Sequence, residues 1–430
     1  MRYGRFGKVV VHFYSIRSCK AGTKWCPERG QAQMERERFV RRGVLCGGIG
    51  FAVLFWLSFE PIAGAQIVGS VDTPGWANAV VVDGGYAYIA DSDSGLTVVD
   101  LSDPADPQVV ATVDTPGTAL GVDVVDAIAY VADYTGGLRL FDVSNPTAAS
   151  PLGSTDTPGD ARKVVVSGTT AFVADNAGGL TVVDVSSSSS PSVVTSFPLT
   201  GIALDVDVSG SMAAVSTGLS ERQAGLEIID ITDPAAPALL GRVEVAGLGY
   251  GVAATIDGET VYLIRAGYYW FPQDQHYVGL EIVDISSPSE PQLLGGTPLR
   301  LPTDTLAHSY GVCVLGSQAI CGSGDGGLNF VDAENPSHPF YLGYIPMTAE
   351  DVVMDGDYFY IAAREYGLIV VDSAAIPEVP FPTGYAWRVT LLLSLVFSGI
   401  AVSRRMYPGG PSSRSAADAP PGRLVQSGDA

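Results

Sequence analysis

The chain has 430 residues, of which 47% are hydrophobic and 16% charged, and it contains 51 glycines and 28 prolines. This apolar content supports a large core and excludes wholesale disorder, and the length fits two ordinary domains or one domain built from repeats. The formal charge of −22 is unevenly distributed: residues 1–65 carry 11 basic and 4 acidic side chains, whereas residues 66–376 carry 8 and 39. A surface this acidic repels phosphate backbones, so nucleic acid is excluded as a partner.

The N-terminal end of the sequence predicts export. A positive region ends at Arg41-Arg42, an apolar region follows over residues 44–59, and Ala63-Gly64-Ala65 supplies small residues for cleavage. This order is typical of a secretory signal peptide, after which the mature chain would begin at Gln66. The expected segments are a non-native upstream extension over residues 1–33 and a signal peptide over residues 34–65 that begins at Met34.

The C-terminal end predicts attachment to the cell envelope. Residues 377–388 form a proline-rich spacer, and residues 389–405 combine an apolar run with Arg404-Arg405. This order resembles the PEP-CTERM and IPTL-CTERM class of bacterial sorting signals, and the resemblance implies a membrane sorting enzyme as a partner. A plain C-terminal transmembrane anchor is the alternative, although the apolar run is shorter than the roughly 20 residues that a spanning helix needs. Residues 406–430 are expected to be a disordered tail, which is a departure from such signals.

A hexapeptide that begins with Gly-Leu and ends with Asp recurs seven times between these two ends. The copies are GLTVVD at 95–100, GLRLFD at 137–142, GLTVVD at 179–184, GLEIID at 225–230, GLEIVD at 279–284, GLNFVD at 327–332 and GLIVVD at 367–372. Around each copy, four short β-rich runs are separated by Gly, Pro, Asp and Asn turns, which is the pattern of a four-stranded antiparallel sheet. Seven such units predict an all-β fold, a seven-bladed β-propeller over residues 66–376.

The repeats also predict how the propeller closes. Residues 66–72 match the outermost strand of a blade with nothing before it, and the last unit stops after its third strand at Asp372. We therefore expect residues 66–72 to pair with the last blade, residues 351–372, so that the ring has no open sheet edge.

The repeated string resembles that of the LVIVD-repeat proteins, whose units end in Gly-Leu, an apolar triplet, Asp, and then Ser and Pro. Residues 95–107 and 225–237 show this pattern well, and the resemblance covers roughly residues 66–376. It implies a bacterial envelope propeller. It adds architecture to the prediction, and no chemistry.

The sequence offers few catalytic motifs, since it has no HExxH, GxSxG, P-loop or CxxC. Cys313 and Cys321 flank a tight turn at Gly316-Ser317 on two neighbouring strands. A cross-strand disulfide is one expectation for an exported protein. Two buried free thiols are the other, because the sequence does not determine the strand register.

Aspartates recur in the loops that would share one face of the propeller, namely the loops between second and third strands and those that enter first strands. The favoured interpretation is that each aspartate caps its own turn. Calcium bound by some of these carboxylates is the alternative, since Asp91-Ser92-Asp93-Ser94-Gly95 resembles part of a calcium loop. The candidate metal ligands are Asp91, Asp93, Asp133 and Asp175.

The fifth unit departs from the repeat through an expanded loop rich in aromatic residues. The candidate ligand-binding residues there are Tyr268, Tyr269, Trp270, Phe271, His276 and Tyr277. Such side chains stack on sugar rings or anchor protein partners. The alternative is that the loop folds back over the mouth of the central channel as a local mini-core.

Alignment of the innermost strands predicts which side chains surround the channel mouth. The outer ring is Asn78, Leu120, Arg162, Leu204, Tyr250, Tyr310 and Glu350, and the charged residues one position deeper are Lys163, Asp205 and Asp351. Of these, Arg162, Tyr250, Tyr310 and Glu350 are candidate contacts for a polar ligand. A channel lined by polar groups and water, without a ligand, is the alternative.

We expect an exported, surface- or membrane-anchored propeller that binds a protein or a polysaccharide at the bacterial cell envelope, with no catalytic residue and no cofactor other than calcium. The rival is an extracellular polysaccharide hydrolase or lyase that uses Asp205, Glu350 or Asp351 with His308. Paired carboxylates at glycosidase separation would favour the enzyme, and an exposed aromatic surface would favour binding. A purely structural envelope component is a third alternative, and the fold alone does not choose among the three.

Overall fold

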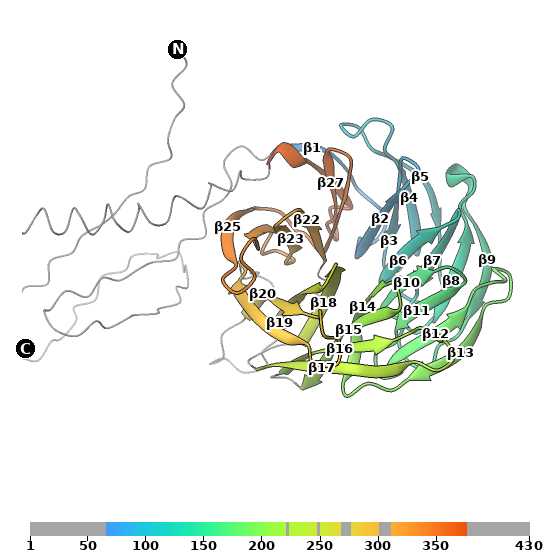
Figure 1. Cartoon of the computed structure of the whole chain (residues 1–430). Coiled ribbons are helices and arrows are strands. Elements are labelled where there is room, and N and C mark those ends of the chain that lie inside the picture. The colour runs from blue at the N-terminus through green and yellow to red at the C-terminus, as the bar shows by residue number, and fades with distance from the viewer. Residues whose placement is uncertain (1–65, 221–222, 247–249, 268–276, 301–310, 376–430) are drawn as a thin grey trace, which may run out of the picture. The chain divides into compact units, whose positions relative to one another are not determined.

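The chain forms a β-propeller with seven blades, as the repeats predict (Figure 1). The computed structural model describes residues 66–220, 223–246, 250–267, 277–300 and 311–375, all within the compact unit Phe59–Ala430. These residues form seven antiparallel sheets of four strands each. The expected upstream extension, signal peptide, spacer, C-terminal helix and tail lie outside the described residues.

Six blades are continuous in sequence, and each runs from its innermost to its outermost strand. Blades 1 to 3 are β2 (Ala79–Asp83), β3 (Tyr86–Ala90), β4 (Leu96–Asp100) and β5 (Gln108–Val113); β6 (Gly121–Val125), β7 (Ile128–Ala132), β8 (Leu138–Asp142) and β9 (Ser150–Thr155); and β10 (Lys163–Ser167), β11 (Thr170–Ala174), β12 (Leu180–Asp184) and β13 (Ser192–Phe197). Blades 4 to 6 are β14 (Ile202–Ser209), β15 (Met212–Ser220), β16 (Gln223–Asp230) and β17 (Ala238–Ala246); β18 (Tyr250–Asp257), β19 (Thr260–Gly267), β20 (Tyr277–Asp284) and β21 (Gln292–Pro298); and β22 (Val312–Leu315), β23 (Gln318–Gly322), β24 (Leu328–Asp332) and β25 (Phe340–Ile345).

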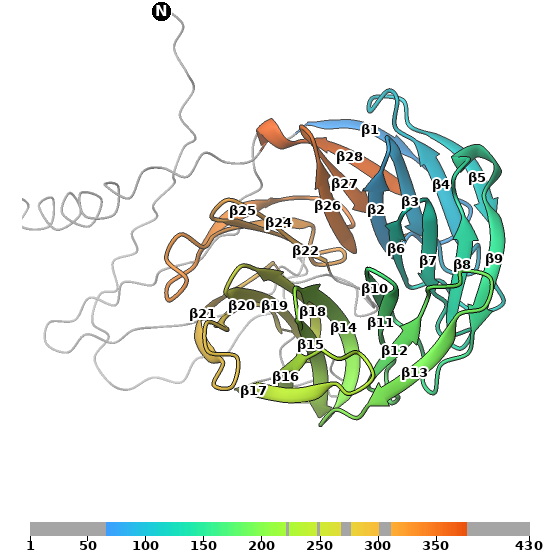
Figure 2. The same ribbon diagram turned by 45° about the vertical axis from the view of Figure 1, so that its right-hand side comes forward.

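Blade 7 joins the two ends of the propeller. Its strands are β26 (Asp351–Asp355), β27 (Tyr358–Ala362), β28 (Leu368–Asp372) and β1 (Ile67–Val71), and short 3-10 helices lie at η1 (Pro146–Ala148) and η2 (Ser373–Ala375). β1 pairs antiparallel with β28, and the two strands lie side by side in Figure 2. The Asp372 N–H also donates a hydrogen bond to the Gln66 carbonyl (3.3 Å). The predicted closure is therefore confirmed.

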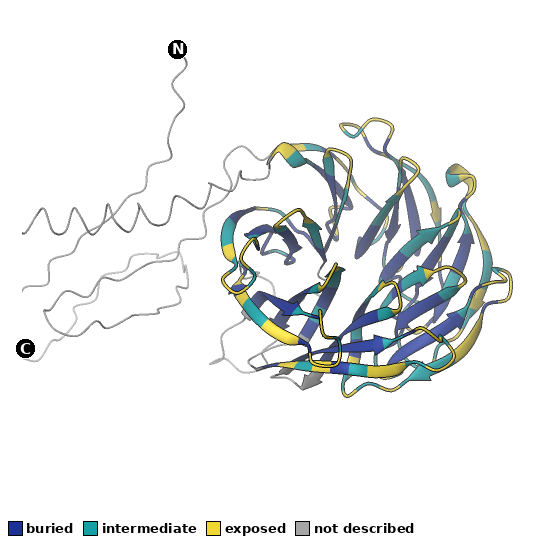
Figure 3. Cartoon of the chain, in the orientation of Figure 1, coloured by how far each residue is buried: buried dark blue, intermediate teal, exposed yellow. Residues whose placement is uncertain are grey.

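The hexapeptides form the third strand of each blade and are buried on both faces. In β4 and β12, the four residues before the terminal aspartate are all buried, and buried residues run along the inner strands of every blade in Figure 3. Each sheet is covered by a neighbour on both sides, so its strands are almost continuously apolar rather than alternating.

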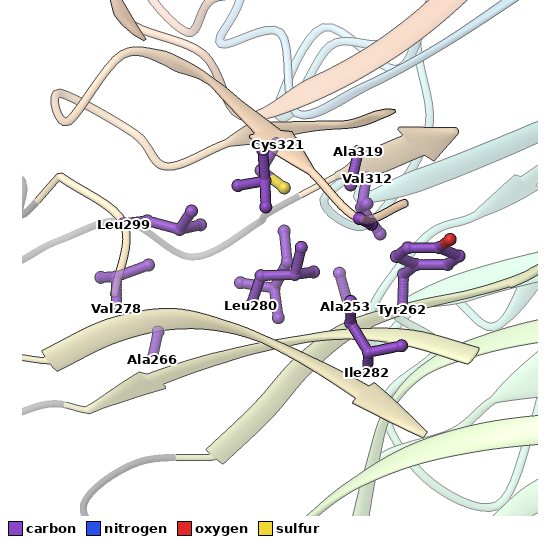
Figure 4. Close-up of a cluster of buried hydrophobic side chains, with 13 residues drawn as sticks. Ala253, Tyr262, Ala266, Val278, Leu280, Ile282, Leu299, Val312, Ala319 and Cys321 are labelled. Atoms are coloured by element: carbon purple, nitrogen blue, oxygen red, sulfur yellow. The ribbon is translucent and has the colours of Figure 1, made fainter. Parts of the chain in front are cut away.

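The core consists of seven hydrophobic layers, one between each pair of neighbouring blades. The layer between blades 5 and 6 contains Ile264, Leu280 and Ile282 from one sheet and Val312 and Cys321 from the other; most of its side chains are drawn in Figure 4. The layer between blades 7 and 1 closes the ring. Burial of one such large aliphatic side chain contributes about 1.5–3 kcal/mol, so stability is distributed around the whole circle.

The strand order gives the propeller two distinct faces. The connectors between blades and the loops between second and third strands share one face, which we call the connector face. The turns between first and second strands and the loops between third and fourth strands share the other, the hairpin face. Both ends of the propeller lie on the hairpin face, since β1 begins there beside Asp372, and the Ser373 N–H donates to the Asp357 carbonyl in the β26–β27 turn (2.8 Å).

Short backbone bridges join neighbouring blades on the connector face. The bridged pairs are Ser92 with Ala119, Tyr134 with Ala161, Asn176 with Ala203, Gly324 with Ala349 and Arg364 with Ala77. The first member of each pair has a positive φ, between 47° and 56°, and its partner is a fully buried alanine. The left-handed residue turns its backbone toward the next connector, and the small alanine allows the close approach.

Candidate functional site

The innermost strands place a ring of small and charged residues around the central channel. Pairing with the second strand of each blade gives seven residues equivalent positions along the innermost strands, and thus the same level along the channel. They are Ala79, Gly121, Lys163, Asp205, Ala253, Gly311 and Asp351. Lys163, Asp205 and Asp351 therefore share a level, as the sequence alignment predicts. Two positions further along lie Asp123 and Asp207.

Lys163 is the basic centre of this group. Burial lowers the pKa of Lys163, but the negative charges of Asp351, Asp205, Asp123 and Asp207 outweigh burial and raise its pKa above the ordinary value. Lys163 therefore stays protonated. Lys163 thus places one positive charge among four carboxylates of the innermost strands.

The channel carboxylates bind the backbone of neighbouring inner strands. Asp351 accepts hydrogen bonds from the N–H of Val352 next to it and of Val80 in the next blade (2.9 and 3.1 Å). Asp123 does the same with Val124 and Val166 (2.8 and 2.7 Å). An innermost strand has an unpaired edge toward the channel, so these carboxylates satisfy N–H groups that no strand can reach.

Blade 4 contributes two such carboxylates. Asp207 accepts from Val208 (2.8 Å) and from Ile256 in blade 5 (2.7 Å). Asp205 accepts from the Ala254 N–H (2.7 Å). Burial raises the pKa of Asp205 to about 7, against the opposing effects of Lys163 and of the Ala254 hydrogen bond.

At the channel mouth, equivalent residues donate their backbone N–H to the last residue of the second strand. They are Asn78, Leu120, Arg162 and Glu350, bonded to Ala90, Ala132, Ala174 and Ala362. Glu350 is buried and forms an ion pair with the buried Arg364. Arg162 is partly exposed.

Two predicted members of the mouth ring need separate placement. In blade 5 a register shift leaves Val252 unpaired. Val252 directly precedes Ala253, so it occupies the mouth position that Asn78 has before Ala79 in blade 1. Tyr250 begins β18 two residues earlier, opposite Ala266. Tyr310 and His308 lie outside the described residues.

The recurring aspartates of the connector face hold the connectors in place. Asp91 is fully buried and accepts hydrogen bonds from the Thr73 hydroxyl (2.7 Å), the Gly75 N–H (3.0 Å) and the Thr97 hydroxyl (2.9 Å). The first two donors belong to the connector that arrives from blade 7. Asp91 thus fastens this connector to the loop and third strand of blade 1.

The next two blades repeat this arrangement. Asp175 accepts from Thr157, Gly159 and Thr181, and Asp133 accepts from Gly117 (2.9 Å) with the Arg139 Nε 3.6 Å away. Burial raises the pKa of both carboxyl groups, and the hydrogen bonds oppose this rise. The three aspartates lie in three different blades.

Asp91 and Asp175 therefore bind the connector and the third strand, so the expectation that each aspartate caps its own turn is wrong for these two residues. Asp93 is exposed and accepts a long hydrogen bond from Thr118 (3.4 Å). Within the described ranges, no group of three His, Cys, Asp or Glu side chains could hold a metal ion.

Blades 4 to 6 replace the loop aspartate with a polar residue at the third position of the hexapeptide. Glu227 accepts from the Thr200 N–H of its connector (2.8 Å), and Asn329 accepts from the Arg300 N–H (3.2 Å). Glu281 pairs with Arg265 (2.7 Å), and both are buried. The sequence analysis did not predict a role for these three residues. A signal is visible, because the third position of the hexapeptide is Thr in blades 1 and 3 but Glu or Asn in blades 4 to 6.

Cys313 and Cys321 are free thiols. Cys313 lies opposite Ile320 and Cys321 lies opposite Val312, so the two cysteines are offset by one residue and their side chains point to opposite faces of the blade. Cys321 packs in the layer shown in Figure 4, whereas Cys313 packs against the layer between blades 6 and 7. This register explains why the predicted disulfide is absent and the alternative of two free thiols holds.

The predicted aromatic loop is described only at its edge. Tyr268, Tyr269, Trp270, Phe271 and His276 lie outside the described residues, and Tyr277 begins β20. The end of β19 and the start of β20, a second and a third strand, lie on the connector face.

The structure adds two exposed aromatic residues to the same face. Trp76, in the connector before blade 1, is 51% exposed, and Tyr366, in the β27–β28 loop, is 56% exposed. Sequence reasoning missed both because it examined the expanded loop alone. Trp76 directly follows an Asp-Thr-Pro-Gly connector, where the two later copies of this string are followed by Thr118 and Asp160.

Comparison with known proteins finds the LVIVD repeat in six segments: residues 74–115, 116–157, 158–198, 200–245, 276–296 and 347–373. No curated protein matches the chain. Among solved structures, the computationally designed Ika8 protein is similar with a TM-score of 0.47 and 10% identity, over 71% of this chain and 99% of that chain. BamB from Moraxella catarrhalis is similar with a TM-score of 0.46 and 12% identity, over 72% and 97%.

Proposed function

Since the chain belongs to the LVIVD-repeat family, whose repeats cover just over half of it, we propose that it is an exported, surface- or membrane-anchored β-propeller that binds a protein or a polysaccharide at the bacterial cell envelope. One observation carries this proposal. The exposed aromatic residues Trp76 and Tyr366 share the connector face with the end of β19 and the start of β20, between which the sequence has its aromatic-rich expansion. Aromatic side chains on one rigid face are typical of binding surfaces.

The channel carboxylates do not favour the rival, a polysaccharide hydrolase or lyase. A glycosidase needs two carboxyl groups that reach the substrate, one as an acid and one as a base or nucleophile. Asp351 accepts backbone hydrogen bonds through both oxygens, and Glu350 is ion-paired with Arg364. Burial raises the pKa of Asp205 to about 7, which suits a general acid, but Asp207 on the same strand accepts backbone hydrogen bonds through both of its oxygens.

The sidedness of the propeller supports anchoring at the envelope. The propeller's first and last described segments, at Gln66 and Ser373, lie on the hairpin face, which is opposite to the connector face and is the side from which an anchor would continue. No helix within the described ranges is long and apolar enough to cross a membrane. Processing by a sorting enzyme or retention of a plain anchor are both compatible with this arrangement.

Export is tested by sequencing the N-terminus of the protein purified from a bacterial host that expresses the full chain. We expect Gln66 as the first residue, and protease treatment of intact cells should remove the propeller from the surface. The mass of the mature C-terminus distinguishes a processed tail from a retained anchor. A mature protein that starts at Met1 or Met34 and stays protected from protease would contradict the proposal.

Binding is tested by applying the full-length protein in mild detergent to a polysaccharide array and by cross-linking it to its neighbours in intact cells. We expect a ligand or partner whose retention falls when Trp76 and Tyr366 are both changed to Ala. Failure to retain any polysaccharide or protein would favour a purely structural envelope component.

A further inference from the structure

The seam between blades 7 and 1 on the connector face carries a compact aromatic and acidic surface. The Arg364 N–H donates to the Ala77 carbonyl and the Ala77 N–H donates to the Arg364 carbonyl, both at 3.1 Å. Trp76 directly precedes Ala77, and Tyr366 follows Arg364 by two residues. The two exposed aromatic residues therefore flank the same two-bond backbone bridge.

The backbone beneath this surface is held from both sides. Asp91 anchors the connector through Thr73 and Gly75. On the other side, the Arg364 side chain is paired with the buried Glu350. A surface that is already rigid loses little conformational entropy when a partner binds.

The charge of this surface is negative. Asp72 and Glu365, on the same two segments, are exposed, and neither forms an ion pair or a side-chain hydrogen bond within the described part of the chain. Asp114, in the equivalent connector before blade 2, is exposed as well. Arg364, which directly precedes Glu365, is already ion-paired with Glu350.

We propose that the seam patch, formed by Trp76, Tyr366, Asp72 and Glu365, binds a protein segment that carries Lys or Arg side chains. Aromatic faces attract cations, most strongly those of Trp, and unpaired carboxylates form charge-assisted hydrogen bonds with guanidinium and ammonium groups. The strongly acidic charge of residues 66–376 steers a basic partner toward the protein and repels an acidic polysaccharide. A neutral polysaccharide would stack on the two rings but would make no use of the charge.

This inference rests on the proposed function and selects one partner class for it. The test uses the full-length protein in mild detergent and a fluorescein-labelled peptide of alternating Arg and Gly, followed by fluorescence anisotropy at low ionic strength. A Glu-Gly peptide of equal length and a neutral β-glucan oligosaccharide are the comparison ligands. We expect the Arg-Gly peptide to bind and the other two to bind at least tenfold more weakly.

Two double variants locate the binding site. Trp76→Ala with Tyr366→Ala should weaken peptide binding about tenfold, the loss of two exposed cation–π contacts. Asp72→Asn with Glu365→Gln should weaken it about threefold to tenfold at low salt, and this difference should shrink as salt screens the charges. The matched controls are Phe340→Ala, an aromatic of similar exposure on β25 (47%), and Glu290→Gln on the hairpin face, and neither should change binding.

The outcomes are distinguishable. Arg-Gly peptide binding that is equal in all variants would overturn the seam patch as the site. Preferred binding of the β-glucan, lost in the aromatic variant, would overturn the basic partner and leave the proposed function intact. If neither ligand binds while cross-linking still captures a partner, the inference fails and the proposed function stands; if nothing binds in any assay, both fail. A thermal melt shows that each variant is folded.

Discussion

At the scale of single residues, the buried carboxylates act mainly as acceptors for backbone and hydroxyl donors. Asp91 and Asp175 each accept three hydrogen bonds that come from a connector and a third strand. In the channel, Asp123, Asp207 and Asp351 each join their own strand to that of the next blade. A buried polar group is costly unless it is paired, and here each pairing also fixes the position of one blade relative to another.

The substitution Asp91→Ala should lower the free energy of unfolding by about 2–4 kcal/mol, because it removes the acceptor of three hydrogen bonds, two of them buried and one part-buried. Urea denaturation of the wild type and the variant measures the difference. Asp93→Ala, two residues away and exposed, is the control and should change it by less than about 0.5 kcal/mol. Calcium should not raise the melting temperature of either protein; a rise that Asp91→Ala abolishes would restore the metal alternative.

Asp205 makes stability depend on pH. Burial raises the pKa of Asp205 in the folded protein to about 7, from 3.8 in the unfolded chain. The folded protein therefore binds more protons than the unfolded chain between these values, and the contribution of Asp205 to stability falls as the pH rises through this window. Below about pH 4 and above about pH 7 its contribution is constant.

Asp205→Asn removes this titration. The variant should therefore gain stability relative to the wild type as the pH rises from about 4 to about 8, by up to about 4 kcal/mol. Urea denaturation of both proteins at each pH measures the change. Asp93→Asn should follow the wild type at every pH, and an Asp205→Asn curve parallel to the wild type would show that Asp205 has an ordinary pKa.

At the scale of elements, each outermost strand contains a bulge at the same position opposite its hexapeptide strand. Each inserted residue is aliphatic, and the set is Val68, Val110, Leu152, Val194, Leu240, Leu294 and Leu342. A bulge twists an edge strand and makes it a poor template for pairing with another chain. The seven outer edges are thus protected even though most of them carry no charge.

The residue after the bulge is glycine in five blades, and in four of them, at Gly69, Gly153, Gly241 and Gly295, a loop of the next blade leaves no room for a Cβ atom. A Cβ on Gly241 would lie 2.7 Å from the Pro291 Cδ and closer still to the Pro288 carbonyl oxygen, both in the loop of the next blade. Ala111 and Thr195 occupy the same position in blades 1 and 3. The bulge itself therefore accepts a side chain, and it is the neighbouring loop that requires glycine.

The substitution Gly241→Ala should destabilise the protein by about 1–3 kcal/mol through overpacking between blades 4 and 5. Gly84→Ala is the control for backbone freedom, because Gly84 has a φ of 59° but nothing within 4 Å of the added methyl group. It should cost about 1 kcal/mol. Denaturation midpoints compare the two, and a Gly241→Ala loss no larger than that of Gly84→Ala would refute the steric explanation.

The sequence predicts the elements well but not their register. The hexapeptides mark every third strand because burial on both faces produces an apolar run between turn residues. The offset of Cys313 from Cys321 depends on the geometry of one turn, and the position of Val252 depends on a bulge. Neither the turn geometry nor the bulge leaves a signal in composition or spacing. The sequence therefore leaves the disulfide alternative open, and its alignment places Tyr250 in the mouth ring, two residues before the true position at Val252.

At the scale of the whole molecule, counting repeats is enough to predict the fold. Seven similar units predict seven blades, and the extra strand at residues 66–72 matches the one that the last unit lacks, so the ring closes when these two pair. The level of Lys163, Asp205 and Asp351 follows from the same repeat. The hydrogen bonds that Asp205 and Asp351 accept from the next blade do not follow from the repeat, because they depend on how two sheets pack. Trp76 and Tyr366 come together for the same reason: they are 290 residues apart in sequence and meet only when blade 7 closes on blade 1.

Closure by β1 should decide the stability of the ring as a whole. Deletion of residues 66–72, with the preceding segment joined to Thr73, leaves β28 as an open edge and removes Val68 and Val71 from the layer between blades 7 and 1. We expect a lower urea midpoint and concentration-dependent oligomers in size-exclusion chromatography, because an unprotected edge pairs with other chains. Neighbouring blades stabilise each other through shared hydrophobic layers, so the loss of stability should extend beyond blade 7.

A synthetic peptide with the sequence of residues 66–72 provides the control for this deletion. Added in excess, it should fill the empty edge beside β28, restore the urea midpoint and suppress the oligomers, whereas a scrambled peptide of the same composition should not. Binding of the peptide to the deleted chain adds stability in proportion to the logarithm of its concentration. A deleted chain that remains monomeric with an unchanged midpoint would show that the ring is held by the seven layers alone and that the shared blade is dispensable.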